Sequence, residues 1–195
     1  MAAVAMFLLV SCSSQDSAGA EEQLAGSLTE LFRQALDNLN PSPVEREVLE
    51  RAIIAGQIDP VDYEDAHIRY ALCMTQHGFD PRFRKTSEGL YVELPYLFVD
   101  NQAALDAAVT KCSQGTSVVE SLYQIQQANP DLLADQRLVA VRCLRARGFV
   151  DAAYTVEDFE KDRTVGKFPF DQYGDEEANN CLWKAGYAYF EIESS

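Results

Sequence analysis

The sequence predicts a mainly α-helical protein with minor β structure, built from a duplicated helical unit that one disulfide closes in each copy. Three observations lead to this class. Helix-start patterns recur along the chain, the segment from Asp59 matches the segment from Asn129, and four cysteines fall at matching places in the two copies. With 47% hydrophobic and 24% charged residues, the chain has the balance of a folded protein rather than a disordered one.

The first residues have the pattern of a bacterial export signal. Residues 1–11 are uncharged and mostly apolar, too short a run to span a membrane but suited to a signal peptide. Leu9-Val10-Ser11-Cys12 resembles a lipobox, which implies cleavage before Cys12 and a lipid on its sulfur. The alternative is a buried helix with an incidental Cys. No basic residue precedes the run, so we expect the natural chain to start further upstream.

Residues 12–20 are small and polar and are expected to form the tether of the anchored protein. Residues 21–40 predict an N-terminal helix, because Leu24, Leu28 and Leu31 begin an apolar face.

Unit one is expected to span residues 42–115. Ser42-Pro43-Val44-Glu45 has the pattern of a capping box, and the helix that it starts should end near Gly56. Asp59-Pro60 starts the next helix, which ends at Gly78. Residues 90–99 are rich in Tyr, Val, Leu and Phe and predict an extended stretch. A helix capped by Asp100 then carries Cys112.

Unit two, residues 116–195, repeats this order. A shift of 70 residues carries Cys73 onto Cys143 and Gly78-Phe79 onto Gly148-Phe149 without a gap. Unit two also has a predicted helix start at Asn129-Pro130 and a second predicted capping box at Ser117-Val118-Val119-Glu120. Residues 164–170 predict a short extended stretch, and a last helix from Asp175 carries Cys181. The two units can pack as one domain.

The cysteines predict two disulfides. Besides Cys12, the chain has four cysteines, an even number that suits an exported protein. A unit that is copied whole carries its own bridge, so we pair Cys73 with Cys112 and Cys143 with Cys181. Each bridge would close a loop worth about 4 kcal/mol in the chain-entropy model. The two cross-unit pairings are the alternatives.

Charge and motifs exclude several functions. The net charge of −15 and the absence of basic clusters argue against nucleic-acid binding. Cys73 and His77 are four residues apart, but a disulfide and a favourable helix-end charge explain them better than a metal does. His67 lies on another side of the same helix. We therefore expect no metal, no cofactor and no catalytic residues.

Aromatic residues offer the best candidates for a ligand pocket between the units. The candidates are Tyr91, Tyr96, Phe98, Phe168, Phe170 and Trp183. Core packing is the alternative use of these side chains. Four carboxylates before the last helix, Asp171, Asp175, Glu176 and Glu177, are expected to cap that helix rather than to bind a cation.

Three short stretches carry a family resemblance: the lipobox ending at Cys12, Ile58 to Ala66 with Asp62-Tyr63 at its centre, and Cys73-Met74 followed by Gly78-Phe79. The chain resembles the small cysteine-bearing lipoproteins of actinobacterial cell envelopes. The resemblance implies an extracytoplasmic protein held at the membrane by a lipid, and it supplies no active site.

The leading hypothesis for function is a non-enzymatic binding or accessory module that contacts an envelope protein or a cell-wall component. The alternative is a small-ligand receptor with a pocket between the units. A hydrolase is the third candidate, since catalytic groups from distant segments leave no short motif.

Overall fold

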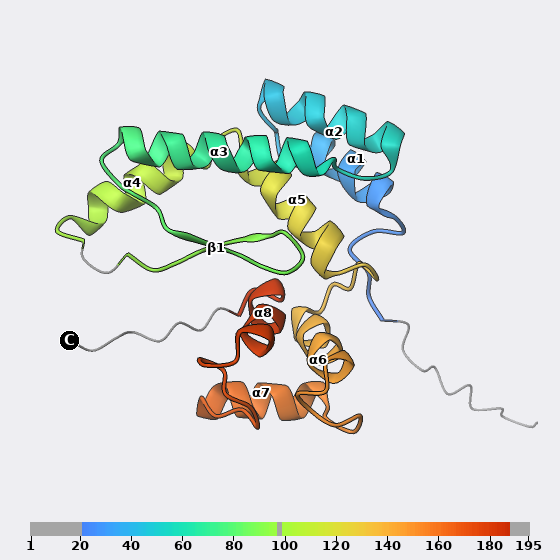
Figure 1. The fold of residues 1–195 in the computed structure, drawn as a ribbon. Coiled ribbons are helices and arrows are strands. Elements are labelled where there is room, and N and C mark those ends of the chain that lie inside the picture. Colours follow the sequence, from blue (N-terminus) through green and yellow to red (C-terminus); the bar gives the residue numbers. More distant parts are fainter. Residues whose placement is uncertain (1–20, 97–98, 188–195) are drawn as a thin grey trace, which may run out of the picture.

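The computed structural model describes residues 21–96 and 99–187, and this part of the chain folds into helices with a two-stranded antiparallel sheet (Figure 1). The predicted class, mainly α with minor β and one disulfide in each unit, is confirmed. The elements are α1 (Leu28–Asn38), α2 (Pro43–Ala55), α3 (Pro60–Gln76), β1 (Phe83–Lys85), β2 (Tyr91–Glu93), α4 (Gln102–Cys112), α5 (Ser117–Ala128), α6 (Gln136–Ala146), α7 (Val156–Val165) and α8 (Glu176–Lys184). Residues 1–20, with Cys12, and Phe98 lie outside the described residues.

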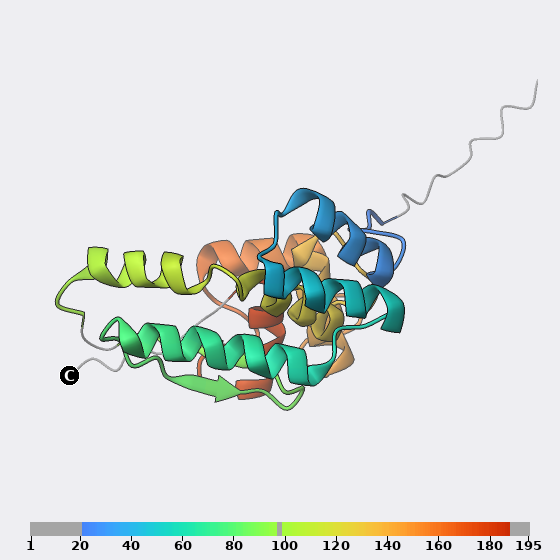
Figure 2. The ribbon, with the colours of Figure 1, turned by 90° about the horizontal axis from the view of Figure 1, so that it is seen from above.

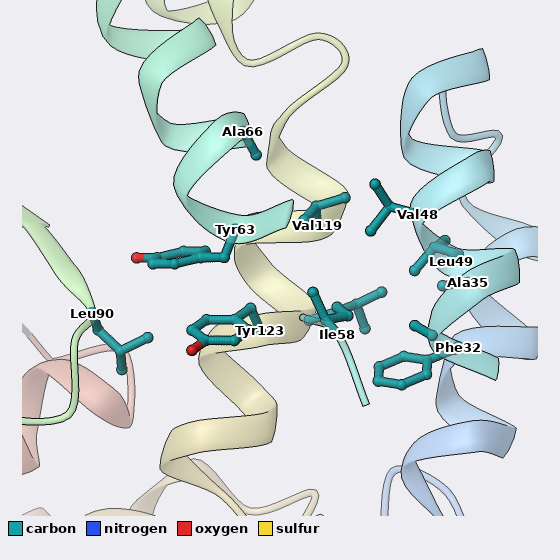
Figure 3. Close-up of a cluster of buried hydrophobic side chains, with 12 residues drawn as sticks. Phe32, Ala35, Val48, Leu49, Ile58, Tyr63, Ala66, Leu90, Val119 and Tyr123 are labelled. Atoms are coloured by element: carbon teal, nitrogen blue, oxygen red, sulfur yellow. The ribbon is translucent and has the colours of Figure 1, made fainter. Parts of the chain in front are cut away.

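One of two main cores forms where α1, α2, α3 and α5 meet. Phe32, Leu49 and Val119 are fully buried there (Figure 3). Tyr63 of α3 and Tyr123 of α5 stack at one end of this core, with ring centroids 4.3 Å apart, and both rings point toward Leu90 (Figure 3). The packing of α5 against the first three helices therefore fixes the positions of α3 and of the segment after β1.

The N-terminal helix is shorter than predicted. It begins at Leu28, where the Ser27 side chain accepts a hydrogen bond from the Glu30 amide. The prediction of helix from residue 21 is wrong because the residues before Ser27 pair with another segment. The Leu24 amide donates to the Leu132 carbonyl at 2.7 Å, and Gln23 forms a β-bridge with Leu133.

The predicted disulfides are present, each joining the two helices expected to carry it. Cys73 of α3 bonds Cys112 of α4, and Cys143 of α6 bonds Cys181 of α8, both with Cα atoms 5.5 Å apart. A small core with Met74, Leu105 and Ala108 surrounds the first bridge. The second lies in a core formed by α6, α7 and α8, in which Phe159 is fully buried (Figure 1).

The ends of α3 and α6 have the same backbone geometry. The Phe79 amide donates to the Met74 carbonyl, and the Phe149 amide donates to the Leu144 carbonyl, both at 3.0 Å. Gly78 and Gly148 adopt φ values of 86° and 77°, the left-handed conformation that closes such a helix end. The register of the duplication is therefore correct at this point.

The starts of the second unit's helices differ from the prediction. Asn129-Pro130 does not begin a helix, because the Asn129 side chain exchanges two 2.9 Å hydrogen bonds with the backbone of Leu133. Asp135 caps α6 instead. The predicted capping box at Ser117 is also absent. Thr116 occupies the N-cap position without a side-chain bond, and the Val118 amide donates to Glu45 at 2.9 Å.

Residues 164–170 do not form the predicted extended stretch. Thr155 and Asp158 form a capping box that starts α7, and this helix continues through Val165 until Gly166 ends it with φ 72°. A helix in unit two thus occupies the place that the β-hairpin has in unit one. The first unit's prediction differs by one residue at α4, which Asn101 caps in place of Asp100.

Ion pairs join the β-hairpin to the second unit. Glu88, in the loop between β1 and β2, contacts Lys184 of α8 at 2.5 Å and also pairs with Arg147. Arg84 of β1 contacts Glu176 at 2.7 Å. Figure 1 shows the hairpin on the side of the upper helices that faces α8. None of the helices in residues 21–96 and 99–187 is both long and apolar enough to cross a bilayer.

Candidate functional site

A cleft of about 420 Å³ lies where the two units meet. Its walls are α3, the β-hairpin, the end of α4, α5 and α8. Figure 2, which views the molecule from above, shows α3, α4 and the hairpin along one flank, with α5 and α8 further in. With unit two beginning at residue 116, both α5 and α8 belong to it, so Trp183 of α8 and the α5 residues give the cleft a lining from both units. This volume falls within the range of small-molecule sites in proteins.

One face of α3 supplies three aromatic groups to the cleft. Tyr63, His67 and Tyr70 are four and three residues apart, so the helix places them above one another on one side. The Tyr63 hydroxyl accepts a 2.8 Å hydrogen bond from the Tyr91 amide, which fixes β2 against α3. Burial raises the pKa of Tyr63 to about 12, so this phenol stays neutral.

His67 is held by aromatic rings rather than by polar partners. It is 7% exposed and lies flat against Tyr91, with ring centroids 3.6 Å apart and an angle of 2° between the planes. Phe83 meets the imidazole edge-on at 4.3 Å. No described residue forms a hydrogen bond with the imidazole nitrogens. The ring is therefore oriented by its aromatic contacts.

Glu93 is a carboxylate held by two neutral donors. The Tyr70 and Tyr96 hydroxyls each donate to one of its oxygens at 2.9 Å. Burial, followed by the influence of Glu93, raises the pKa of Tyr70 and of Tyr96 well above the usual phenol range. Both phenols therefore act as neutral donors, and the negative charge on Glu93 is not cancelled.

Glu120 supplies a second carboxylate from α5. Its oxygen lies 3.6 Å from His67 Nδ1, which is longer than a hydrogen bond, and its side chain is about one-quarter exposed. The residues that line the cleft include neither Lys nor Arg. Ser113, Ser117, Ser121 and Gln124 complete the polar side. The cleft thus combines aromatic rings with two carboxylates and a set of neutral hydrogen-bonding groups.

The described residues contain one group of three possible metal ligands that lie close enough to share an ion, Cys73, His77 and Cys112. The two sulfurs are bonded to each other, so they are not thiolates and cannot bind a metal while the bridge is intact.

A serine nucleophile in the cleft would need a hydrogen bond from its hydroxyl to a base. Among the described residues, no hydrogen bond links His67 to a serine hydroxyl of the cleft.

A second depression, of about 530 Å³, lies between α1 and α5. Its apolar side chains include Leu31, Leu39, Leu122 and Ile125, and no charged residue lines it. Its polar groups are the neutral side chains of Gln34, Asn38, Ser117 and Ser121, whereas the cleft between the units adds carboxylates and a histidine, so we treat that cleft as the candidate site.

The structure separates the predicted pocket aromatics. Tyr91 and Trp183 line the cleft. Tyr96 lies behind it, where it donates to Glu93 and meets Phe79 edge-on. Phe168 and Phe170 stack on each other in the core of the second unit, so core packing is their use.

The acidic residues before α8 also have different roles. Asp175 caps the helix, whereas Glu176 pairs with Arg84 and Glu177 pairs with Arg147.

The sequence interpretation missed the polar centre of the cleft. His67 and Glu120 are far apart in the sequence, so no short motif joins them. The sequence pattern instead places Glu120 in the predicted capping box at Ser117. Only the spacing of Tyr63, His67 and Tyr70 marked a common helix face in the sequence.

The chain matches no protein-family model, no curated protein and no solved structure. The two disulfides are consistent with an extracytoplasmic location.

Proposed function

We propose that this protein is an exported, lipid-anchored receptor that binds a small organic ligand in the cleft between its two disulfide-closed units. The observation that carries the proposal is the cleft itself. It joins an aromatic wall to convergent polar groups, and it is completed by Trp183 from the second unit. Binding sites for small molecules have this combination of apolar surface and a few placed polar groups.

The location rests on the lipobox and on the disulfides. The residues through Leu9-Val10-Ser11-Cys12 carry the pattern of a cleaved, lipid-modified export signal, and a lipid pair on one Cys holds a protein stably at a membrane. Cys12→Ala should therefore move the protein from the membrane fraction to the soluble extracytoplasmic fraction. Retention of the mutant in the membrane fraction would show that the lipobox interpretation is wrong.

Binding can be followed through Trp183, which is the only tryptophan of the chain. The mature protein would be titrated with glucose, glycine and choline, one probe each for a neutral sugar, an amino acid and an organic cation. We expect at least one probe to change the Trp183 emission with saturation. Gln124→Phe fills the cleft and should abolish this change, whereas Gln127→Phe, at an exposed position one turn further along the same helix and outside the cleft lining, should leave it intact. If none of the three probes produces a saturable change, the receptor proposal fails.

An exposed apolar stripe favours a second candidate, an accessory module that docks on an envelope protein. Val61, Ile68 and Leu72 lie on one side of α3 and are all at least half exposed. Ile68→Glu should then abolish a specific cross-link formed in intact cells, while ligand binding in the cleft persists. A cross-linking pattern unchanged by Ile68→Glu would leave this candidate without support.

A further inference from the structure

We infer that the ligand of the cleft is an organic cation, such as a substituted ammonium group, which the aromatic rings and Glu120 hold together. This inference rests on the proposed receptor function and names the chemical class that the same site would take. Three features support it: the balance of charge in the cleft, the lack of a hydrogen-bond donor to Glu120 among the described residues, and the cation–π contact that Lys85 already makes with Tyr91.

The charge balance of the cleft disfavours anionic ligands. Glu93 and Glu120 both line the cleft, and no Lys or Arg does. The whole chain carries a net charge of −15, so the surrounding field also repels anions and attracts cations. A phosphate or carboxylate ligand would therefore meet two like charges, with the His67 imidazole as the one basic group among the described residues of the lining.

The two carboxylates have different parts in this arrangement. Glu93 is held on both oxygens by tyrosine hydroxyls, so it contributes a fixed negative charge to the lining of the cleft. Glu120 accepts no hydrogen bond from a described residue, and its nearest basic neighbour is His67 at 3.6 Å. Glu120 is therefore the group with the capacity to form a direct ion pair with a ligand.

Aromatic rings near the cleft already hold a cation. The Lys85 ammonium lies 4.7 Å from the centroid of the Tyr91 ring, within the range of a cation–π contact. Its charge is also neutralised by Glu64, whose pKa is lowered by Lys85 and Tyr91 in spite of partial burial. The cleft lining supplies the same two kinds of group, since the aromatic rings of Tyr70 and Trp183 and the carboxylate of Glu120 all belong to it.

A neutral sugar is the competing ligand class, because aromatic rings and hydroxyl groups also suit a sugar. The uncompensated charges of Glu93 and Glu120 favour the cation. A neutral ligand would leave both carboxylates facing the cleft without an opposite charge, whereas a cation would supply that charge as it displaces water.

The test compares choline with 3,3-dimethylbutan-1-ol, which has the same shape but no charge, by calorimetric titration of the mature protein. We expect choline to bind at least about tenfold more tightly than the alcohol, and Glu120→Gln to weaken choline binding about tenfold. Glu50→Gln removes the same charge from an exposed position on α2 and should leave the affinity unchanged. Thermal unfolding of both variants checks that they remain folded.

The outcomes separate this inference from the receptor function. If the alcohol or glucose binds in the cleft as tightly as choline, the ligand is not selected by charge and the inference is overturned, while the receptor function stands. If Glu120→Gln and Glu50→Gln bind choline equally well, the assignment of Glu120 is overturned. If no probe binds the folded protein, both the inference and the receptor function fall.

Discussion

Glu45 is a buried carboxylate that satisfies the starts of two helices. It is 2% exposed, and its two oxygens accept hydrogen bonds from the Ser42 amide of α2 and the Val118 amide of α5, each at 2.9 Å. The first of these bonds is the predicted capping box. The second joins residues 73 positions apart and replaces the side-chain cap that α5 lacks.

Glu45→Ala should therefore cost more than the loss of one ordinary cap. Two helix-end amides would lose a charged acceptor in a buried place, and we expect the free energy of unfolding to fall by about 2–3 kcal/mol. Glu47→Ala, at an exposed position on the same helix, should change it by less than about 0.5 kcal/mol. Urea unfolding of the two variants measures the difference, and equal losses would refute the double-cap role.

The residues of the cleft were only partly accessible to prediction. Helix periodicity places Tyr63, His67 and Tyr70 on one face, but it does not say what that face meets. The contact of His67 with Tyr91 depends on the β-hairpin folding back onto α3, and Glu120 approaches only because α5 packs across α3. The sequence therefore identifies some of the aromatic residues of the cleft, whereas the contribution of Glu93 and Glu120 is visible only in the tertiary structure.

At the scale of elements, the helix ends that glycine marks were predicted, whereas the helix starts of the second unit were not. The ends of α3 and α6 depend on a nearby glycine and its own helix, so the Gly78 and Gly148 patterns identified both correctly. The start of α6 depends on a distant strand-like segment. Residues near Gln23 pair with Leu133, and Asn129 bonds the same loop, which shifts the helix start to Asp135.

The equivalent helix ends give a test of the duplication at this scale. Gly148 has φ 77° and open space around its Cα, so Gly148→Ala would be strained by its backbone conformation alone. We expect a loss of about 1–2 kcal/mol in the free energy of unfolding, and a similar loss for Gly78→Ala. Gly148→Asn should be milder, because Asn tolerates the left-handed region better. If Ala and Asn cost the same in thermal unfolding, the backbone explanation is wrong.

At the scale of the whole molecule, Glu88 is the centre of the contact between the hairpin and the C-terminal helices α6 and α8. Lys184, whose side chain is 6% exposed, and Arg147 both reach it from the second unit. Burial opposes the charge of Glu88, but the hydrogen bond and the charge of Lys184 outweigh it and lower the pKa of Glu88 to about 2. The hairpin and the second unit are therefore held together most strongly while Glu88 is ionised.

This arrangement predicts how stability depends on pH. Because the pKa of Glu88 is lower in the folded protein than its usual value, its contribution is present at neutral pH and is lost as pH falls from about 4.5 toward 2. In Glu88→Gln the melting temperature should start lower at pH 6 and should fall less steeply over that range. Identical pH profiles for the two proteins would exclude this role for Glu88.

The central claim is that a small ligand binds between the two disulfide-closed units. The most direct test is a nuclear magnetic resonance titration of the isotope-labelled mature protein with choline. The account predicts saturable shifts of the Trp183 indole resonance together with those of His67, Tyr91 and Glu120, on elements of both units. Shifts confined to the depression between α1 and α5, or no saturable shifts at all, would contradict it.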